Sequence, residues 1–236
     1  METTKMKKPV YLLAGGRPRG SDTTDRLFRA VLDESGKDSP VIAYTGTASG
    51  DDSNFFNHMT GMLKMSGAGN ISHAVIAPEN ADLDKARNIL QAADIIFVGG
   101  GDVDGGMRVL REKNMVGFLE GLYEQGKVFF GTSAGAIMLV KEWVRWTDPD
   151  DADSAELFPC LNFAPVICDC HDEEGGWQEL IAALELEEIN TLGYGLSSGT
   201  GIKVYPDGAV EALAEPVYRY MRKQGGVKKI ANLPWC

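Results

Sequence analysis

The sequence predicts an α/β fold, a doubly wound, mostly parallel sheet with helices on both faces and a C-terminal antiparallel extension. Short runs rich in Val, Ile and Phe alternate with amphipathic stretches through the first half of the chain. The short runs are apolar on both faces, as strands buried in a parallel sheet tend to be. With 44% hydrophobic and 24% charged residues, the composition is that of a globular protein. One domain over 1–236 is expected, with a flexible tail at 1–8.

Strands and helices are expected to alternate in the first half, which predicts parallel strands joined by helical crossovers. The expected strands are Val10–Ala14, Val41–Thr45, Ser72–Ile76, Ile95–Val98 and Val128–Phe130. The expected helices are Thr23–Leu32, Asp51–Met65, Leu83–Ala92, Val103–Arg111 and Val116–Gln125.

The second half of the chain loses this alternation. In order, we expect a helix at Ala134–Trp143, an acidic loop at Asp148–Glu156, an apolar run at Phe163–Cys168 and a helix at Trp177–Leu186. Turns rich in Gly, Pro and Asp then separate four runs that are expected to form antiparallel strands. These runs are Leu192–Leu196, Gly201–Tyr205, Val210–Leu213 and Val217–Tyr220.

The charge balance and the cysteines exclude several classes of protein. With 34 acidic and 23 basic residues the net charge is −11, which argues against a general nucleic-acid binder. No apolar run is long enough for a membrane span or a signal-peptide core. Four cysteines, unevenly placed, do not make a disulfide framework, so a cytoplasmic location is expected.

Two glycine-rich turns follow expected strands without completing a nucleotide-binding motif. Gly15 and Gly20 have the outer spacing of a P-loop, but Ser21-Asp22 follow, so the phosphate-binding lysine is missing. After Gly99-Gly100-Gly101, Asp104 stands where a dinucleotide fingerprint needs a third glycine. Tight turns explain these glycines, and no organic cofactor is expected.

A third turn, Gly131-Thr132-Ser133-Ala134-Gly135, has the pattern G-x-S-x-G between an expected strand and an expected helix. On such a strained turn the serine hydroxyl is exposed at the carboxyl edge of the sheet, because the flanking residues are small. The helix start behind it would supply free N–H groups to a developing oxyanion. Ser133 is therefore the candidate nucleophile.

A serine nucleophile needs a base, and the chain has three histidines. His58 falls within an expected helix and His73 within or beside a strand, so both are interpreted as structural or surface residues. His171 follows an apolar run and precedes a loop, which makes it the candidate base. The carboxylates that could orient its imidazole lie in the acidic loop: Asp148, Asp150, Asp151 and Asp153.

The segment Cys168-x-Cys170-His171 is unsuited to holding a metal ion. Three ligands within four residues are too cramped for one tetrahedral zinc, and no second cluster follows. No metal is expected.

Four elements, in this order, resemble the peptidase E and cyanophycinase family of serine peptidases. They are Ile95–Asp102, the nucleophile turn Gly131–Ala136, Phe163–His171 and the G-x-G-hydrophobic element Gly193–Leu196. The resemblance implies a fold like that of class I glutamine amidotransferases. It also implies hydrolysis of short peptides, in the manner of a dipeptidase or exopeptidase, through an acyl-enzyme without metal or cofactor.

The resemblance also implies the roles of individual residues. Ser133 matches the nucleophile and His171 the general base. Asp148 lies fifteen residues after the serine, where the peptidase E branch has its acidic triad member, and is preferred to Asp150. The backbone N–H groups of Gly101 and Ala134 match the oxyanion hole.

Two departures from the family concern the substrate. Aspartyl-specific relatives carry arginines after the histidine, whereas here the run Asp172–Glu174 is acidic and no arginine follows before Arg219. Ser197-Ser198 also replaces an acidic pair that many relatives have. Neither aspartyl dipeptides nor cyanophycin are therefore expected as substrates.

The expected substrate-binding residues are Asp102, Asp172 and Glu173. We expect the acidic run after His171, together with the loop around Asp148, to make the mouth of the cleft negative. Such a mouth would favour a free α-ammonium or a basic side chain over a carboxylate.

Two other functions stay open. An α/β-hydrolase esterase shares the G-x-S-x-G turn, although Ser133 and His171 are only 38 positions apart, which is close for that fold. The other is a catalytically silent amidotransferase-like binding or scaffold domain. A small peptide is the expected partner, without nucleic acid or membrane, and a homodimer is an open alternative.

Overall fold

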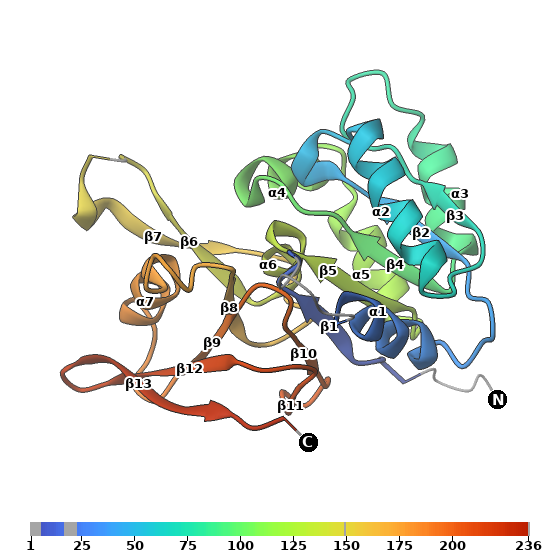
Figure 1. The fold of residues 1–236 in the computed structure, drawn as a ribbon. Helices are drawn as coiled ribbons and strands as arrows, with labels where there is room; N and C mark the ends of the chain where they lie inside the picture. Colours follow the sequence, from blue (N-terminus) through green and yellow to red (C-terminus); the bar gives the residue numbers. More distant parts are fainter. Residues whose placement is uncertain (1–5, 17–22, 149, 236) are drawn as a thin grey trace.

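A computed structural model describes residues 6–16, 23–148 and 150–235 (Figure 1). Most of the tail expected at 1–8 lies outside these residues. Among the described residues, no helix has the length and apolar composition needed to cross a bilayer.

The centre of the molecule is a seven-stranded sheet in the order β11-β10-β1-β5-β4-β2-β3 (Figure 1). Five of its strands are parallel, and β10 and β11 extend it in antiparallel pairing beyond β1. The parallel strands are β1 Val10–Leu13, β2 Ile42–Thr45, β3 Ile71–His73, β4 Ile95–Val98 and β5 Val128–Thr132. The antiparallel strands are β10 Gly201–Val204 and β11 Val210–Ala212.

Helices cover both faces of this sheet, which is why its central strands are buried. Side chains of α1 and α2 pack in one apolar cluster against one face, and those of α3 to α6 in another. The helices are α1 Thr23–Glu34, α2 Ser53–Met65, α3 Leu83–Ala92, α4 Val103–Glu112, α5 Val116–Glu124 and α6 Ala134–Leu139. The predicted fold class is confirmed.

A second sheet, in the order β13-β12-β9-β8, carries the C-terminal part of the chain beside the first (Figure 1). Its strands are β8 Ile167–Cys170, β9 Leu192–Leu196, β12 Val217–Lys223 and β13 Gly226–Leu233. Helix α7, Gln178–Glu185, packs against it. Cys168 and Leu196 of this sheet belong to the same buried cluster as Leu12 and Ala136, so the two sheets share one core.

Three expectations for the second half are wrong in detail. The helix expected to run to Trp143 ends at Leu139, because Glu142–Trp146 pairs as β6 with β7, Ala155–Pro159. The expected acidic loop holds the turn of this hairpin and the first residues of β7. β9, expected to be antiparallel, pairs in antiparallel with β12 but in parallel with β8 on its other side. β13 has too polar a sequence to be recognised.

Candidate active site

The strand-to-helix turn places Ser133 at the carboxyl end of β5, immediately before α6. Its backbone has φ 54° and ψ −126°, a strained conformation for a residue with a side chain. A Cβ on Gly131 would overlap the carbonyl of Gly135, and one on Gly135 would overlap the carbonyl of Val98. Both positions therefore require glycine, and the hydroxyl of Ser133 is held at the edge of the sheet.

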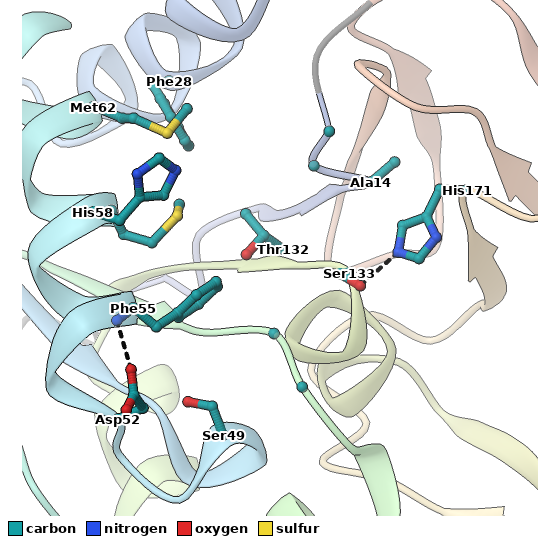
Figure 2. Close-up of a pocket in the computed structure, with 15 residues that line it drawn as sticks. Ala14, Phe28, Ser49, Asp52, Phe55, His58, Met62, Thr132, Ser133 and His171 are labelled. Carbon is teal, nitrogen blue, oxygen red and sulfur yellow. Dashed lines mark hydrogen bonds between the residues drawn. The ribbon is translucent and has the colours of Figure 1, made fainter.

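His171 follows β8 directly and comes from the smaller sheet. Its backbone N–H donates to the carbonyl of Leu196 at 2.8 Å, which holds the residue beside the end of β9. Its ring Nε2 lies 2.7 Å from Oγ of Ser133 (Figure 2). A hydroxyl and an imidazole at this distance can exchange a proton, so the two residues can act as nucleophile and base.

The glycine triple after β4 lies beside this pair. Gly101 has φ +145°, and a Cβ there would overlap the backbone of Ala48. The next N–H, that of Asp102, donates to the carbonyl of Ala48 at 2.8 Å and fixes the turn. The N–H groups of Gly101 and Ala134 form no hydrogen bond to a described residue, and both residues line the cavity at Ser133. They are available to bind an oxyanion.

The structure does not bring Asp148 or Asp150 to His171. Both are exposed in the turn of the β6–β7 hairpin, where a carboxylate oxygen of Asp148 accepts the N–H of Asp150 at 3.1 Å. In the part of the chain that the structure describes, no carboxylate is hydrogen-bonded to the ring of His171. The last residues of the expected helix and the expected acidic loop belong instead to the β6–β7 hairpin, which extends away from the central sheet (Figure 1).

Glu173 is a carboxylate near His171. Its Oε1 accepts the backbone N–H of Ser198 at 3.1 Å. Burial raises the pKa of Glu173, but hydrogen bonds from its own amide and from Ser198, together with the charge of His171, lower it below its ordinary value. Its negative charge therefore acts on the imidazole.

Two cavities meet at Ser133 and His171. The first, of about 920 Å³, is mostly apolar and is lined by Phe28 of α1 and by side chains of α2 (Figure 2). Those side chains are Phe55, His58, Met59 and Met62. The second, of about 670 Å³, lies toward α7 and β6 and is lined by four carboxylates: Asp102, Asp169, Asp172 and Glu179. The candidate nucleophile therefore lies between an apolar space and an acidic one.

Asp169 is the most unusual of these carboxylates, since its side chain is 95% buried at the end of β8. Oδ1 accepts the N–H of Cys170 at 2.7 Å, whereas Oδ2 accepts no hydrogen bond from a described residue. Burial, reinforced by the charges of Glu179 and Asp172, raises the pKa of Asp169 to about 7. The hydrogen bond from the Cys170 amide and, to a lesser extent, the nearby amide of Leu180 lower this pKa in part.

The cysteines beside the site are thiols. Among the described residues Cys160, Cys168 and Cys170 are free. The interaction of the Cys170 thiol with Cys168, together with burial, raises the pKa of Cys170. No group of described His, Cys, Asp and Glu side chains is arranged to hold a metal ion.

Sequence reasoning selected Asp102 and Asp172, which line the acidic cavity, and Glu173, which lies beside His171. It missed Asp169, Glu179 and the role of α2 in the apolar cavity. A signal for Asp169 was present, because it is a charged residue within the apolar strand that ends at His171. His58, interpreted as structural or surface, is an exposed residue that lines the apolar cavity.

Comparisons with known proteins assign the chain to a family. The model of peptidase family S51 matches residues 10–211, which include every element of the site. The chain belongs to peptidase family S51. It is therefore a serine-type peptidase, and the resemblance to peptidase E is confirmed.

Individual proteins are similar to the chain in sequence or in fold. The uncharacterized peptidase YgaJ of Bacillus subtilis is 24% identical over 234 residues, covering 97% of both chains. A peptidase from an acI-B1 Actinobacterium has a similar structure, with a TM-score of 0.70, 13% identity and coverage of 96% of this chain and 95% of that one. A Listeria monocytogenes protein named Peptidase E has a TM-score of 0.59 and 15% identity, covering 96% and 100%.

Proposed function

We propose that this S51 peptidase hydrolyses short peptides through an acyl-enzyme on Ser133, with His171 as the general base. The observation that carries the proposal is the 2.7 Å separation of Ser133 Oγ and His171 Nε2, at a turn whose glycines expose the hydroxyl.

The chemistry follows from this geometry. Nε2 of His171 accepts the hydroxyl proton of Ser133 as Oγ attacks the peptide carbonyl, and the oxyanion binds the N–H groups of Gly101 and Ala134. The imidazolium then donates its proton to the leaving amine, and the C–N bond breaks. A water molecule, deprotonated by the same imidazole, hydrolyses the acyl-enzyme and restores the serine.

We assign the carboxylate that stabilises the charged imidazole to Glu173 rather than to Asp148. Glu173 is held by the Ser198 amide, and the charge of His171 acts on it, whereas the contacts of Asp148 lie within its own hairpin. An anion at this position stabilises the imidazolium that forms during attack. Glu173 is thus a positioning residue, acting through His171.

The apolar cavity supports a substrate other than an aspartyl peptide. Phe28, Phe55 and Met62 would bury a large apolar side chain beside Ser133, whereas a carboxylate would lose its hydration against them. Among the described residues that line this cavity, only His58 and His171 could carry a positive charge. Cavities of about 920 and 670 Å³ on the two sides of the nucleophile have the size of small-ligand sites. Both points favour cleavage of short peptides, as in a dipeptidase or exopeptidase.

Labelling with a fluorophosphonate tests the proposed nucleophile. The wild-type protein is expected to gain one covalent adduct, which peptide mass spectrometry should locate at Ser133. Ser133→Ala is expected to gain none, and His171→Ala to react far more slowly. An adduct on Ser133→Ala would refute the assignment, and a wild type that never reacts would favour the silent scaffold alternative.

Glu173→Gln is expected to lower kcat, because loss of the negative charge makes the imidazolium that forms during attack less favourable. Glu174→Gln removes the same charge one residue further along the chain and should retain the wild-type kcat. Glu173→Asp restores the charge and should recover much of the lost rate. Equal losses in Glu173→Gln and Glu174→Gln, or no recovery in Glu173→Asp, would leave Glu173 a structural role only.

A further inference from the structure

The carboxylates of the acidic cavity have no Lys or Arg counterion in the part of the chain that the structure describes. Asp102, Asp169, Asp172 and Glu179 make no ion pair with a described Lys or Arg. Two basic side chains near this cavity are paired elsewhere. Arg145 of β6 pairs with Asp104 and Glu156, and Lys141, which precedes β6, pairs with Glu142 and Glu187. Apart from His171, no basic residue is found among the described residues that line the cavity.

Hydrogen bonds fix three of these carboxylates in place. Asp102 accepts the N–H of Gly105 at 3.1 Å, and Asp172 accepts the N–H of Gln178 at 3.0 Å. Glu179 accepts the indole N–H of Trp143 at 2.7 Å. Each bond uses one oxygen, so the anions are positioned in advance and keep acceptor capacity toward the cavity.

The negative charges also oppose one another. Asp172 and Glu179 both raise the pKa of Asp169, and Asp172 adds to the effect of burial in raising the pKa of Glu179. Oδ2 of Asp169 is buried without a hydrogen bond in the wall of this cavity. A cation bound there would relieve both the mutual repulsion and the cost of the unpartnered oxygen.

The arrangement favours an organic cation over a metal ion. No three of the described carboxylates converge as metal ligands do. The four are instead spread around a space of about 670 Å³ that reaches Ser133. An ammonium group with three donors, carried on a substrate, suits such a site.

We propose that the acidic cavity is a substrate subsite that binds a primary ammonium group. Asp172 and Glu179, which are half-buried, contact the ammonium directly, and Asp169 acts on it from within the wall. The ammonium is either the α-amino group of a peptide or the side chain of a lysine, and the other side of the scissile bond faces the apolar cavity. The inference rests on the proposed function and specifies its substrate class.

Binding to the Ser133→Ala protein tests the subsite without requiring turnover. Calorimetric titration would compare leucyl-phenylalanine amide with its N-acetyl form, which removes the α-ammonium. A second pair, N-acetyl-lysyl-phenylalanine amide and its norleucine counterpart, isolates the side-chain ammonium. At least one of the charged peptides is expected to bind about tenfold more tightly than its neutral match. The pair that shows this difference identifies whether the bound ammonium is the α-amino group or the lysine side chain.

The double substitution Asp172→Asn/Glu179→Gln, made in the same Ser133→Ala protein, should abolish this preference. Asp207→Asn/Glu185→Gln makes the same change of charge at exposed positions away from the cavity and should retain it. If the double variant does not fold, Asp172→Asn alone should reduce the preference several-fold. Equal binding of charged and neutral peptides, or a preference that survives loss of both carboxylates, would overturn the subsite.

The outcome is separable from that of the proposed function. Fluorophosphonate labelling reports on the nucleophile of the wild type, whereas the titrations report on the cavity. If Ser133 is labelled but the titrations show no preference for an ammonium group, the subsite is refuted and the proposed function stands. If the titrations show the preference but the wild type does not react with the fluorophosphonate, the proposed mechanism on Ser133 is refuted and the subsite stands.

Discussion

Replacing Ser133 or His171 with alanine is expected to lower kcat on leucyl-phenylalanine by a factor on the order of 10⁴ or more, and the double replacement should cost no more than either single one. The two groups perform one proton transfer across their 2.7 Å contact, so removing either leaves the other without a function. Initial rates of amine release, measured for both single variants and the double variant, would show this non-additivity.

Ser72→Ala is the matched control for this experiment. It removes a serine hydroxyl from β3, the edge strand of the central sheet, and should retain the wild-type rate. If the fold-losses of kcat in the two single variants multiplied in the double variant, the two residues would act independently, contrary to the proposed mechanism.

The stability of Asp169→Asn relative to wild type is expected to increase as the pH rises from 4 to 8. The pKa of Asp169 is about 7 in the folded protein against an ordinary value of 3.8, so the folded state binds more protons than the unfolded state between these pH values. The stability that Asp169 contributes is complete below pH 4 and is lost as the pH rises through 7. The loss corresponds to roughly 4 kcal/mol.

Urea unfolding at a series of pH values would measure the difference. The free energy of unfolding of Asp169→Asn minus that of wild type should increase by a few kcal/mol between pH 4 and pH 8. Asp207→Asn makes the same chemical change in an exposed turn and should run parallel to wild type. If the free energy of unfolding of Asp169→Asn also ran parallel to that of wild type, the pKa of Asp169 would not be raised in the folded protein.

The central sheet could be predicted because its signals are local. Each buried strand is a short apolar run, and the turn at Ser133 needs only small residues between a strand and a helix. The prediction also selected His171, which the structure places 2.7 Å from Ser133 although it belongs to another sheet. Its position before a loop at the end of an apolar run was sufficient.

The acidic part of the site could be predicted only in part, because the positions of Glu179 and Asp148 depend on contacts distant in sequence. Trp143 was expected at the end of a helix, but as part of β6 it holds Glu179 of α7 through its indole N–H. The same hairpin carries Asp148 to its exposed turn. Whether an acidic residue lies beside His171 thus depends on how β6, α7 and β8 pack, which no local pattern records.

The two reacting groups belong to different layers of the molecule. Ser133 is fixed by the seven-stranded sheet and His171 by the four-stranded one, so their contact exists only while these layers keep their mutual position. Regions of a protein open with different free energies, and an activity shared by two regions ends when the less stable one opens. The activity of this enzyme therefore requires that both sheets stay docked on their shared core, and it ends when either of them opens.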